Sequence, residues 1–137
     1  MRMITTFPLM ALALIVYNGF AFGAAAGAQA WAGEVFAVTM VSGARWSVTL
    51  GDAMLAFALV LLFFEVVKAT RIGRLSIVDH MLSTLVLIVF VVEFLLVPAA
   101  ATSVFFLLMA MTLLDVMAGF SVSIRSATRD VSLGEGL

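Results

Sequence analysis

Four long apolar stretches divide the chain, and each has about the length that a transmembrane helix needs. A helix crosses the hydrocarbon core of a bilayer with about 20 mostly apolar residues. Pro98 follows the third stretch and cannot continue a helical hydrogen-bond ladder, so a short uncharged turn should join the last two. The pattern predicts one all-α transmembrane domain over 1–137, a four-helix bundle whose helices cover residues 7–31, 49–69, 77–96 and 103–124.

Residues 34–48 have a different pattern. Valine, phenylalanine, threonine and tryptophan alternate loosely with small or polar residues on either side of Ser42 and Gly43, a dipeptide typical of turns. We predict a short extracytoplasmic β-hairpin here, between the first two helices. An irregular loop at the membrane interface is the alternative.

The composition places the chain among integral membrane proteins. Hydrophobic residues make up 65% and charged residues 11%, with a mean hydropathy of +1.27, whereas a soluble domain carries about 25% charged residues. The net charge is −1 and no basic tract is present, which argues against a nucleic-acid partner. The absence of cysteine excludes disulfides and thiol chemistry.

The positive charges predict the orientation. Cytoplasmic loops of membrane proteins are enriched in lysine and arginine. Of the seven lysine and arginine residues, Arg45 would lie in the hairpin and the other six on the opposite side of the membrane. Both termini and the tail 125–137 should therefore be cytoplasmic. The bilayer is then the bacterial inner membrane, crossed several times. The six are Arg2, Lys68, Arg71, Arg74, Arg125 and Arg129.

The first apolar stretch has two interpretations. Residues 1–30 carry an early arginine, an apolar core and the tripeptide Ala28-Gln29-Ala30, which together fit a cleaved signal peptide. The apolar stretch is longer than a leader needs, however, and would reach ~37 Å as a helix. We therefore expect it to be retained as the first helix.

Small residues in this stretch predict close helix packing. Gly19, Gly23 and Gly27 form a double G-x-x-x-G, a spacing that lets a second helix approach closely, within one bundle or between copies. Asn18 lies on a neighbouring stripe. The helical rise places Asn18 within ~5 Å of Asp115 in depth, so the two are expected partners.

Two acidic residues are explained as helix caps. Asp52 follows Thr49 by three residues, and Asp79 follows Ser76 by three, so each pair approximates a capping box at a helix start. Glu65 has a local partner in Lys68 at i+3.

Other polar residues are candidates for function because ionisable groups are costly in the membrane. Glu93 and Asp115 lie within the third and fourth stretches, and His80 is the only histidine. A polar arc on the third helix should point into the bundle. Asp115 either has a structural role as a protonated, hydrogen-bonded group or binds a cation or proton. The candidates for an ion or proton pathway are Asp115, Glu93, Glu65, His80 and Asn18.

Two functions of different classes fit these features. No catalytic, nucleotide-binding or metal-binding motif is present, so we expect no enzyme, cofactor or metal. The first hypothesis is a non-enzymatic accessory or self-associating subunit, embedded in lipid as a homo-oligomer or in a larger membrane-protein complex. The alternative is a small oligomeric ion channel or proton-coupled transporter that uses acids at three depths along one path.

Overall fold

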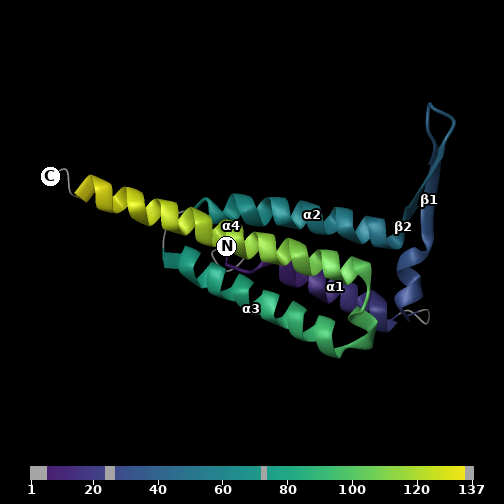
Figure 1. Cartoon of the computed structure of the whole chain (residues 1–137), viewed down its shortest axis with the longest axis horizontal. Coiled ribbons are helices and arrows are strands. Elements are labelled where there is room, and N and C mark those ends of the chain that lie inside the picture. The colour runs from purple at the N-terminus through teal and green to yellow at the C-terminus, as the bar shows by residue number, and fades with distance from the viewer. Residues whose placement is uncertain (1–5, 24–26, 72–73, 135–137) are drawn as a thin grey trace.

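The computed structural model describes residues 6–23, 27–71 and 74–134, and these are mostly helical (Figure 1). Four α-helices and one β-hairpin account for most of them, and 3₁₀ turns occupy two of the connections. In chain order the elements are α1 (Leu9–Gly23), η1 (Gly27–Ala32), β1 (Glu34–Thr39), β2 (Arg45–Thr49), α2 (Leu50–Ala69), α3 (Arg74–Leu96), η2 (Pro98–Ala100) and α4 (Ser103–Gly134).

The helices form a four-helix bundle. Helix α4 packs against α2 and α3, and α1 packs against the same two helices on the other side of the bundle. Three helices, α2, α3 and α4, are long and apolar enough to cross a membrane, whereas α1 is a shorter apolar helix of 15 residues. Three of the four apolar spans predicted from the sequence are therefore present as long helices.

Three predicted boundaries are wrong. The first helix does not run unbroken over 7–31, because α1 ends at Gly23 and Gly27 has a φ of +55°, outside helical space. The third helix begins at Arg74 instead of 77. The expected tail is helical, since α4 continues to Gly134 and extends beyond the other helices (Figure 1). Arg2 and residues 135–137 lie outside the described residues.

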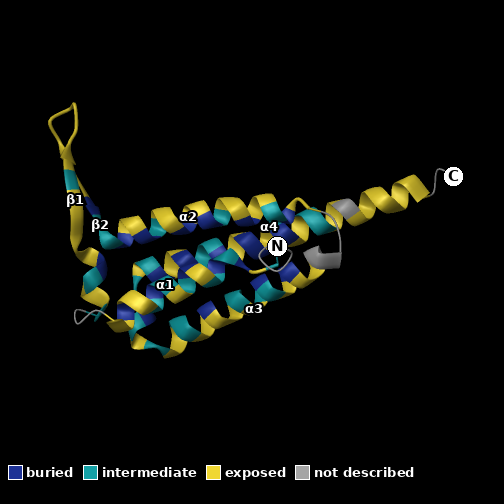
Figure 2. Ribbon diagram, turned by 180° about the vertical axis from the view of Figure 1, so that it is seen from behind, coloured by how far each residue is buried: buried dark blue, intermediate teal, exposed yellow. Residues whose placement is uncertain are grey.

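Burial follows the helical repeat, as Figure 2 shows. Each helix turns one face to the core and leaves leucine, valine and phenylalanine exposed on its outer side. On α1 the buried residues recur every three or four positions, at Met10, Ala13, Tyr17 and Ala21. Such a large exposed apolar surface is unusual for a protein in water and is the expected surface of a bundle in lipid.

An aromatic cluster closes the end of the bundle near the hairpin. Tyr17 is fully buried, stacks on Trp31 at a centroid distance of 4.5 Å and meets the edge of Phe105 at 4.9 Å. Its hydroxyl donates to the carbonyl of Ala99 at 2.8 Å and lies 2.7 Å from the Thr102 Oγ1. The cluster therefore ties α1 and η1 to the turn between α3 and α4.

The predicted hairpin is present. Strands β1 and β2 pair antiparallel around a turn that contains Ser42 and Gly43, with an irregular register near Glu34. An exposed ion pair of 2.8 Å joins Arg45 to Glu34. The hairpin leads directly into α2, where the Thr49 hydroxyl accepts from the Asp52 N–H and the Asp52 carboxylate accepts from the Thr49 N–H. Thr49 and Asp52 thus form the capping box that their spacing predicted.

Candidate functional site

Buried polar side chains gather where α2, α3 and α4 meet, at the end of the bundle away from the hairpin. Apart from Lys68, each is at most 7% exposed, which is unusual for ionisable groups. The group, called the polar cluster below, consists of Glu65 and Lys68 from α2, Asp79, His80 and Ser83 from α3, and Asp115 from α4.

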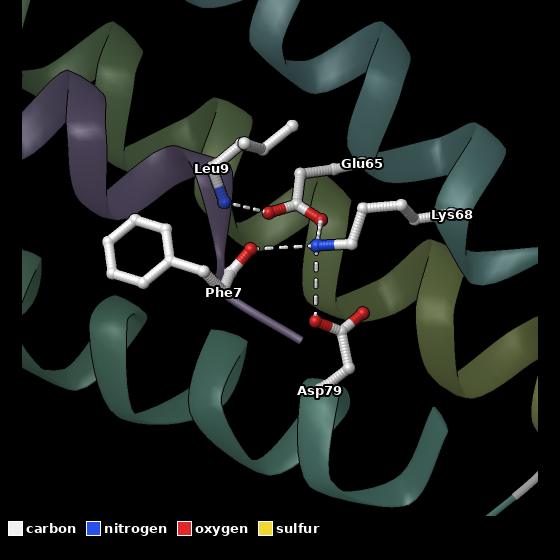
Figure 3. Close-up of polar contacts among 5 residues, drawn as sticks. All are labelled: Phe7, Leu9, Glu65, Lys68 and Asp79. Carbon is white, nitrogen blue, oxygen red and sulfur yellow. Dashed lines mark hydrogen bonds and ion pairs between the residues drawn. The ribbon is translucent and has the colours of Figure 1, made fainter. Parts of the chain in front are cut away.

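Lys68 lies at the centre of the polar cluster (Figure 3). Its Nζ is 3.0 Å from the Glu65 Oε2 and 3.2 Å from the Asp79 Oδ1, and it donates to the backbone carbonyl of Phe7 at 2.8 Å. An ammonium has three donors, and here each has an oxygen nearby. Lys68 therefore links α2, α3 and the segment that leads into α1.

Glu65 completes the link to α1. Its side chain is 1% exposed, and its Oε1 accepts a hydrogen bond from the backbone N–H of Leu9, the first residue of the helix (Figure 3). The first N–H groups of a helix have no partner within the helix, and a carboxylate there also interacts favourably with the helix dipole. The two oxygens of Glu65 thus serve different partners, the start of α1 and Lys68.

Asp115 supplies a third buried carboxyl. Glu65, Asp79 and Lys68 are its charged neighbours, and Ser83 is its hydrogen-bond neighbour. Its Oδ2 is buried and has no hydrogen-bond partner among the described residues. Three carboxylates and one ammonium would give a net charge of −2 if all were ionised. Burying unpaired charge is costly, so neutrality requires two further positive charges, as bound protons or cations.

His80 fits against α4 because residue 119 is glycine. The imidazole also lies near Phe120, with a centroid distance of 6.2 Å. A Cβ atom at Gly119 would be 2.5 Å from the His80 Nδ1 and 2.6 Å from its Cε1, closer than real side chains approach. Gly119 therefore sets how closely α3 and α4 pack beside the polar cluster.

We predict that Gly119→Ala destabilises the bundle, because the imidazole or one of the helices must move. Overpacking of this kind costs about 1–3 kcal/mol. Gly134→Ala is the matched control, since a Cβ there meets no atom within 4 Å. Thermal unfolding in detergent should show a lower midpoint for Gly119→Ala than for the control, and His80→Ala in the same chain should remove most of the difference. Equal midpoints for the two alanine variants would contradict the close contact.

A second polar location lies toward the hairpin end, between α1 and α3. An open groove of about 500 Å³ is lined mainly by apolar side chains, with Asn18 and Glu93 as its polar groups. The Asn18 Oδ1 is buried and has no hydrogen-bond partner among the described residues. Glu93 is 14 residues from Asp79 on α3, which is ~21 Å along the helix axis. The groove and the polar cluster are therefore separate.

The exposed face of α1 continues from this groove. Gly19 and Gly23 lie on the side of α1 away from its buried residues, and a Cβ at either glycine would meet no atom within 4 Å. The same is true of Gly27, which lies in η1 and outside the helix. The prediction of one continuous glycine ridge is therefore wrong, and the two helical glycines pack against nothing within the described part of the chain.

The structure also corrects two predicted pairings. Ser76 lies inside α3, because the helix begins at Arg74, and so it is not the N-cap; Asp79 pairs with Lys68 instead. Asn18 does not pair with Asp115: it lines the groove with Glu93, while Asp115 belongs to the polar cluster. Glu65 and Asp115 are neighbours in the polar cluster, whereas Glu93 lines the separate groove.

The pairing of Glu65 with Lys68 was predictable from their local spacing, but three features of the site were not. These are the Lys68–Asp79 ion pair, the contacts to the backbone of Phe7 and Leu9, and the fit of His80 on Gly119. Each joins separate elements, so only the packing of the bundle reveals it. Acidic residues within the predicted helices indicated that a polar cluster exists, but they did not indicate which residues belong to it.

Within the described ranges, no group of three or more histidine and acidic side chains is arranged to hold a metal ion. No protein-family model, no curated protein and no solved structure matches this chain. Any functional assignment therefore depends on the groups described above.

Proposed function

We propose that the chain is a small multi-pass protein of the bacterial inner membrane that acts without catalysis, as a self-associating or accessory subunit of a membrane complex. In this proposal all four helices cross the bilayer, both termini are cytoplasmic and the hairpin is on the outer side. Support for the orientation comes from the positive charges: Lys68, Arg71, Arg125 and Arg129 follow the polar-cluster end of the bundle, and Arg45 lies in the hairpin.

The packing of α1 supports its retention as a membrane helix. Fifteen residues of α-helix span ~22 Å, most of a hydrocarbon core about 30 Å thick. Removal of residues 1–30 would take Tyr17 out of the core and the Phe7 carbonyl away from Lys68. We therefore infer that α1 belongs to the folded protein.

The observation that carries the proposed function is the groove between α1 and α3. It places the polar side chains of Asn18 and Glu93 in an otherwise apolar groove, on a surface that would face hydrocarbon. An unsatisfied polar group is costly in lipid, and hydrogen bonds from a neighbouring helix relieve that cost. The adjacent face with Gly19 and Gly23 lets another backbone come close. A transmembrane helix of a second subunit satisfies both features.

Substitution of Gly19 by leucine tests this docking surface. The new side chain meets no atom of the described chain, so we expect the monomer to keep its thermal stability while its assembly is lost. Ala56→Leu, on the exposed side of α2, is the matched control and should leave assembly intact. The measurement is subunit composition after purification at native abundance, with single-molecule counting of copies in the membrane. Unchanged assembly in Gly19→Leu would rule out this surface.

A second candidate function is supported by the polar cluster. Its carboxyl groups outnumber its ammonium by three to one, and one oxygen of Asp115 has no described partner, so the cluster has capacity for a proton or cation. Ionisable groups held within a membrane bundle are characteristic of ion and proton pathways. In this candidate the pathway uses Asp115, Glu65, Asp79 and His80.

Flux measurements separate this candidate from the first. If the polar cluster conducts, proteoliposomes should show a proton or cation flux that Asp115→Asn abolishes. Glu93→Gln is the control, because Glu93 lines the separate groove and its change should leave the flux intact. Flux no greater than that of protein-free liposomes would eliminate the pathway and leave the polar cluster with its structural role.

A further inference from the structure

The hairpin has one apolar face and one polar face. Side chains of paired residues in an antiparallel ladder lie on the same side, and successive residues alternate sides. On one side are the pairs Phe36–Val48 and Val38–Trp46, and on the other are Ala37–Ser47 and Thr39–Arg45. We call the side with Phe36, Val38, Trp46 and Val48 the apolar face of the hairpin.

Most of this apolar face is uncovered. Phe36 is 51% exposed and Trp46 is 55% exposed, although their rings pack edge to face at 6.5 Å. Val48 is buried at the base, where the hairpin joins the bundle, so the apolar face continues from the protein core. A two-stranded hairpin alone is marginally stable in water, and burial of one apolar face is what usually stabilises it.

The direction of the hairpin indicates what covers this face. In Figures 1 and 2 the two strands leave the end of the bundle at a steep angle to the helices and extend sideways past α2. If the helices cross a bilayer, a hairpin that leaves their ends sideways runs along the bilayer surface, over the lipid beside α2. Tryptophan and phenylalanine are favoured at this depth, where the apolar region meets the headgroups.

We propose that the hairpin is a membrane-surface anchor that rests its apolar face on the outer leaflet of the bilayer. Phe36, Val38 and Trp46 enter the boundary between headgroups and acyl chains. The Arg45–Glu34 ion pair and the polar face remain in water. The anchor would fix the depth and rotation of the bundle in the membrane. This inference rests on the proposal that the bundle spans the bilayer, but it does not depend on the subunit that α1 and α3 would bind.

Single cysteines test the anchor, because the natural chain has none. Val38→Cys and Thr39→Cys place a spin label on the apolar and polar faces at adjacent positions, and Leu107→Cys places one on the exposed side of α4. Each variant is labelled in nanodiscs of phosphatidylethanolamine and phosphatidylglycerol. The measurement is relaxation of the label by oxygen, which concentrates in lipid, and by a water-soluble nickel chelate.

We expect oxygen to dominate at positions 107 and 38 and the nickel chelate to dominate at position 39. Nickel access at both 38 and 39, with oxygen still dominant at 107, would overturn the anchor and leave the membrane-spanning proposal intact. Shielding of position 38 from both agents would also overturn it, because it would show that protein covers the apolar face. Nickel access at 107 would show instead that α4 does not face lipid, and both proposals would fail.

Discussion

Replacing Lys68 with methionine is expected to destabilise the bundle by about 3–5 kcal/mol, the usual cost of breaking a buried charge pair. Methionine has a similar length, so the change removes charge with little change in volume. It leaves Glu65 and Asp79 without the ammonium that now lies 3.0 and 3.2 Å from them, and it frees the carbonyl of Phe7. The measurement is the folded fraction in detergent as the proportion of denaturing detergent rises.

Arg71→Met is the matched control for this experiment. Arg71 is exposed and lies three residues further along the chain, so its loss should change stability by only a few tenths of a kcal/mol. Adding Glu65→Gln and Asp79→Asn to the Lys68 variant removes the unpaired charges and should recover most of the lost stability. A Lys68→Met protein as stable as Arg71→Met would show that the ion pairs are not holding the bundle together.

Truncation of Tyr17 is the second change with a large expected effect. Tyr17→Ala should cost about 3–5 kcal/mol, as other large aromatic-to-alanine changes in cores do. The side chain is fully buried, stacks on Trp31 and bonds the turn after α3 through its hydroxyl. Thermal unfolding followed by the near-ultraviolet signal of the tryptophans would report the loss.

Two further variants show which part of Tyr17 matters. Tyr17→Phe keeps the ring and should lose only about 0.5–1.5 kcal/mol, the net value of its hydrogen bonding. Phe22→Ala removes a ring of similar size that is 67% exposed on the same helix, and it should have a small effect. If Tyr17→Ala and Phe22→Ala had the same unfolding midpoint, α1 would not be packed into the bundle as described.

Local signals in the sequence predicted the elements of this fold well. Hydropathy located the three long helices, alternation around Ser42 and Gly43 located the hairpin, and the spacing of Thr49 and Asp52 located a helix start. Each of these depends on residues close together in the chain. The start of α3 was missed because Ser76 and Asp79 imitate a cap inside a helix that already began at Arg74.

The site was less predictable because it depends on which helix faces are neighbours. Periodicity places Asp79 and Asp115 on inward faces, but it does not say that Lys68 lies beside Asp79 or that Gly119 admits His80. Depth alone suggested the pairing of Asn18 with Asp115. The packing instead leaves Asn18 in the groove with Glu93. The helical rise gives the depth of a residue in the membrane, but it does not say which neighbouring helix that residue faces.

The arrangement of the four crossings is the claim on which the functional proposals depend, and cysteine labelling in intact cells tests it most directly. Three variants carry one cysteine each: in a tag before Met1, at Val41 in the hairpin tip, and at Arg129 near the end of α4. A membrane-impermeant maleimide should label Val41→Cys from outside and the other two only after lysis. Labelling of the tag from outside, or its loss from the mature protein, would show that α1 is not a retained crossing helix.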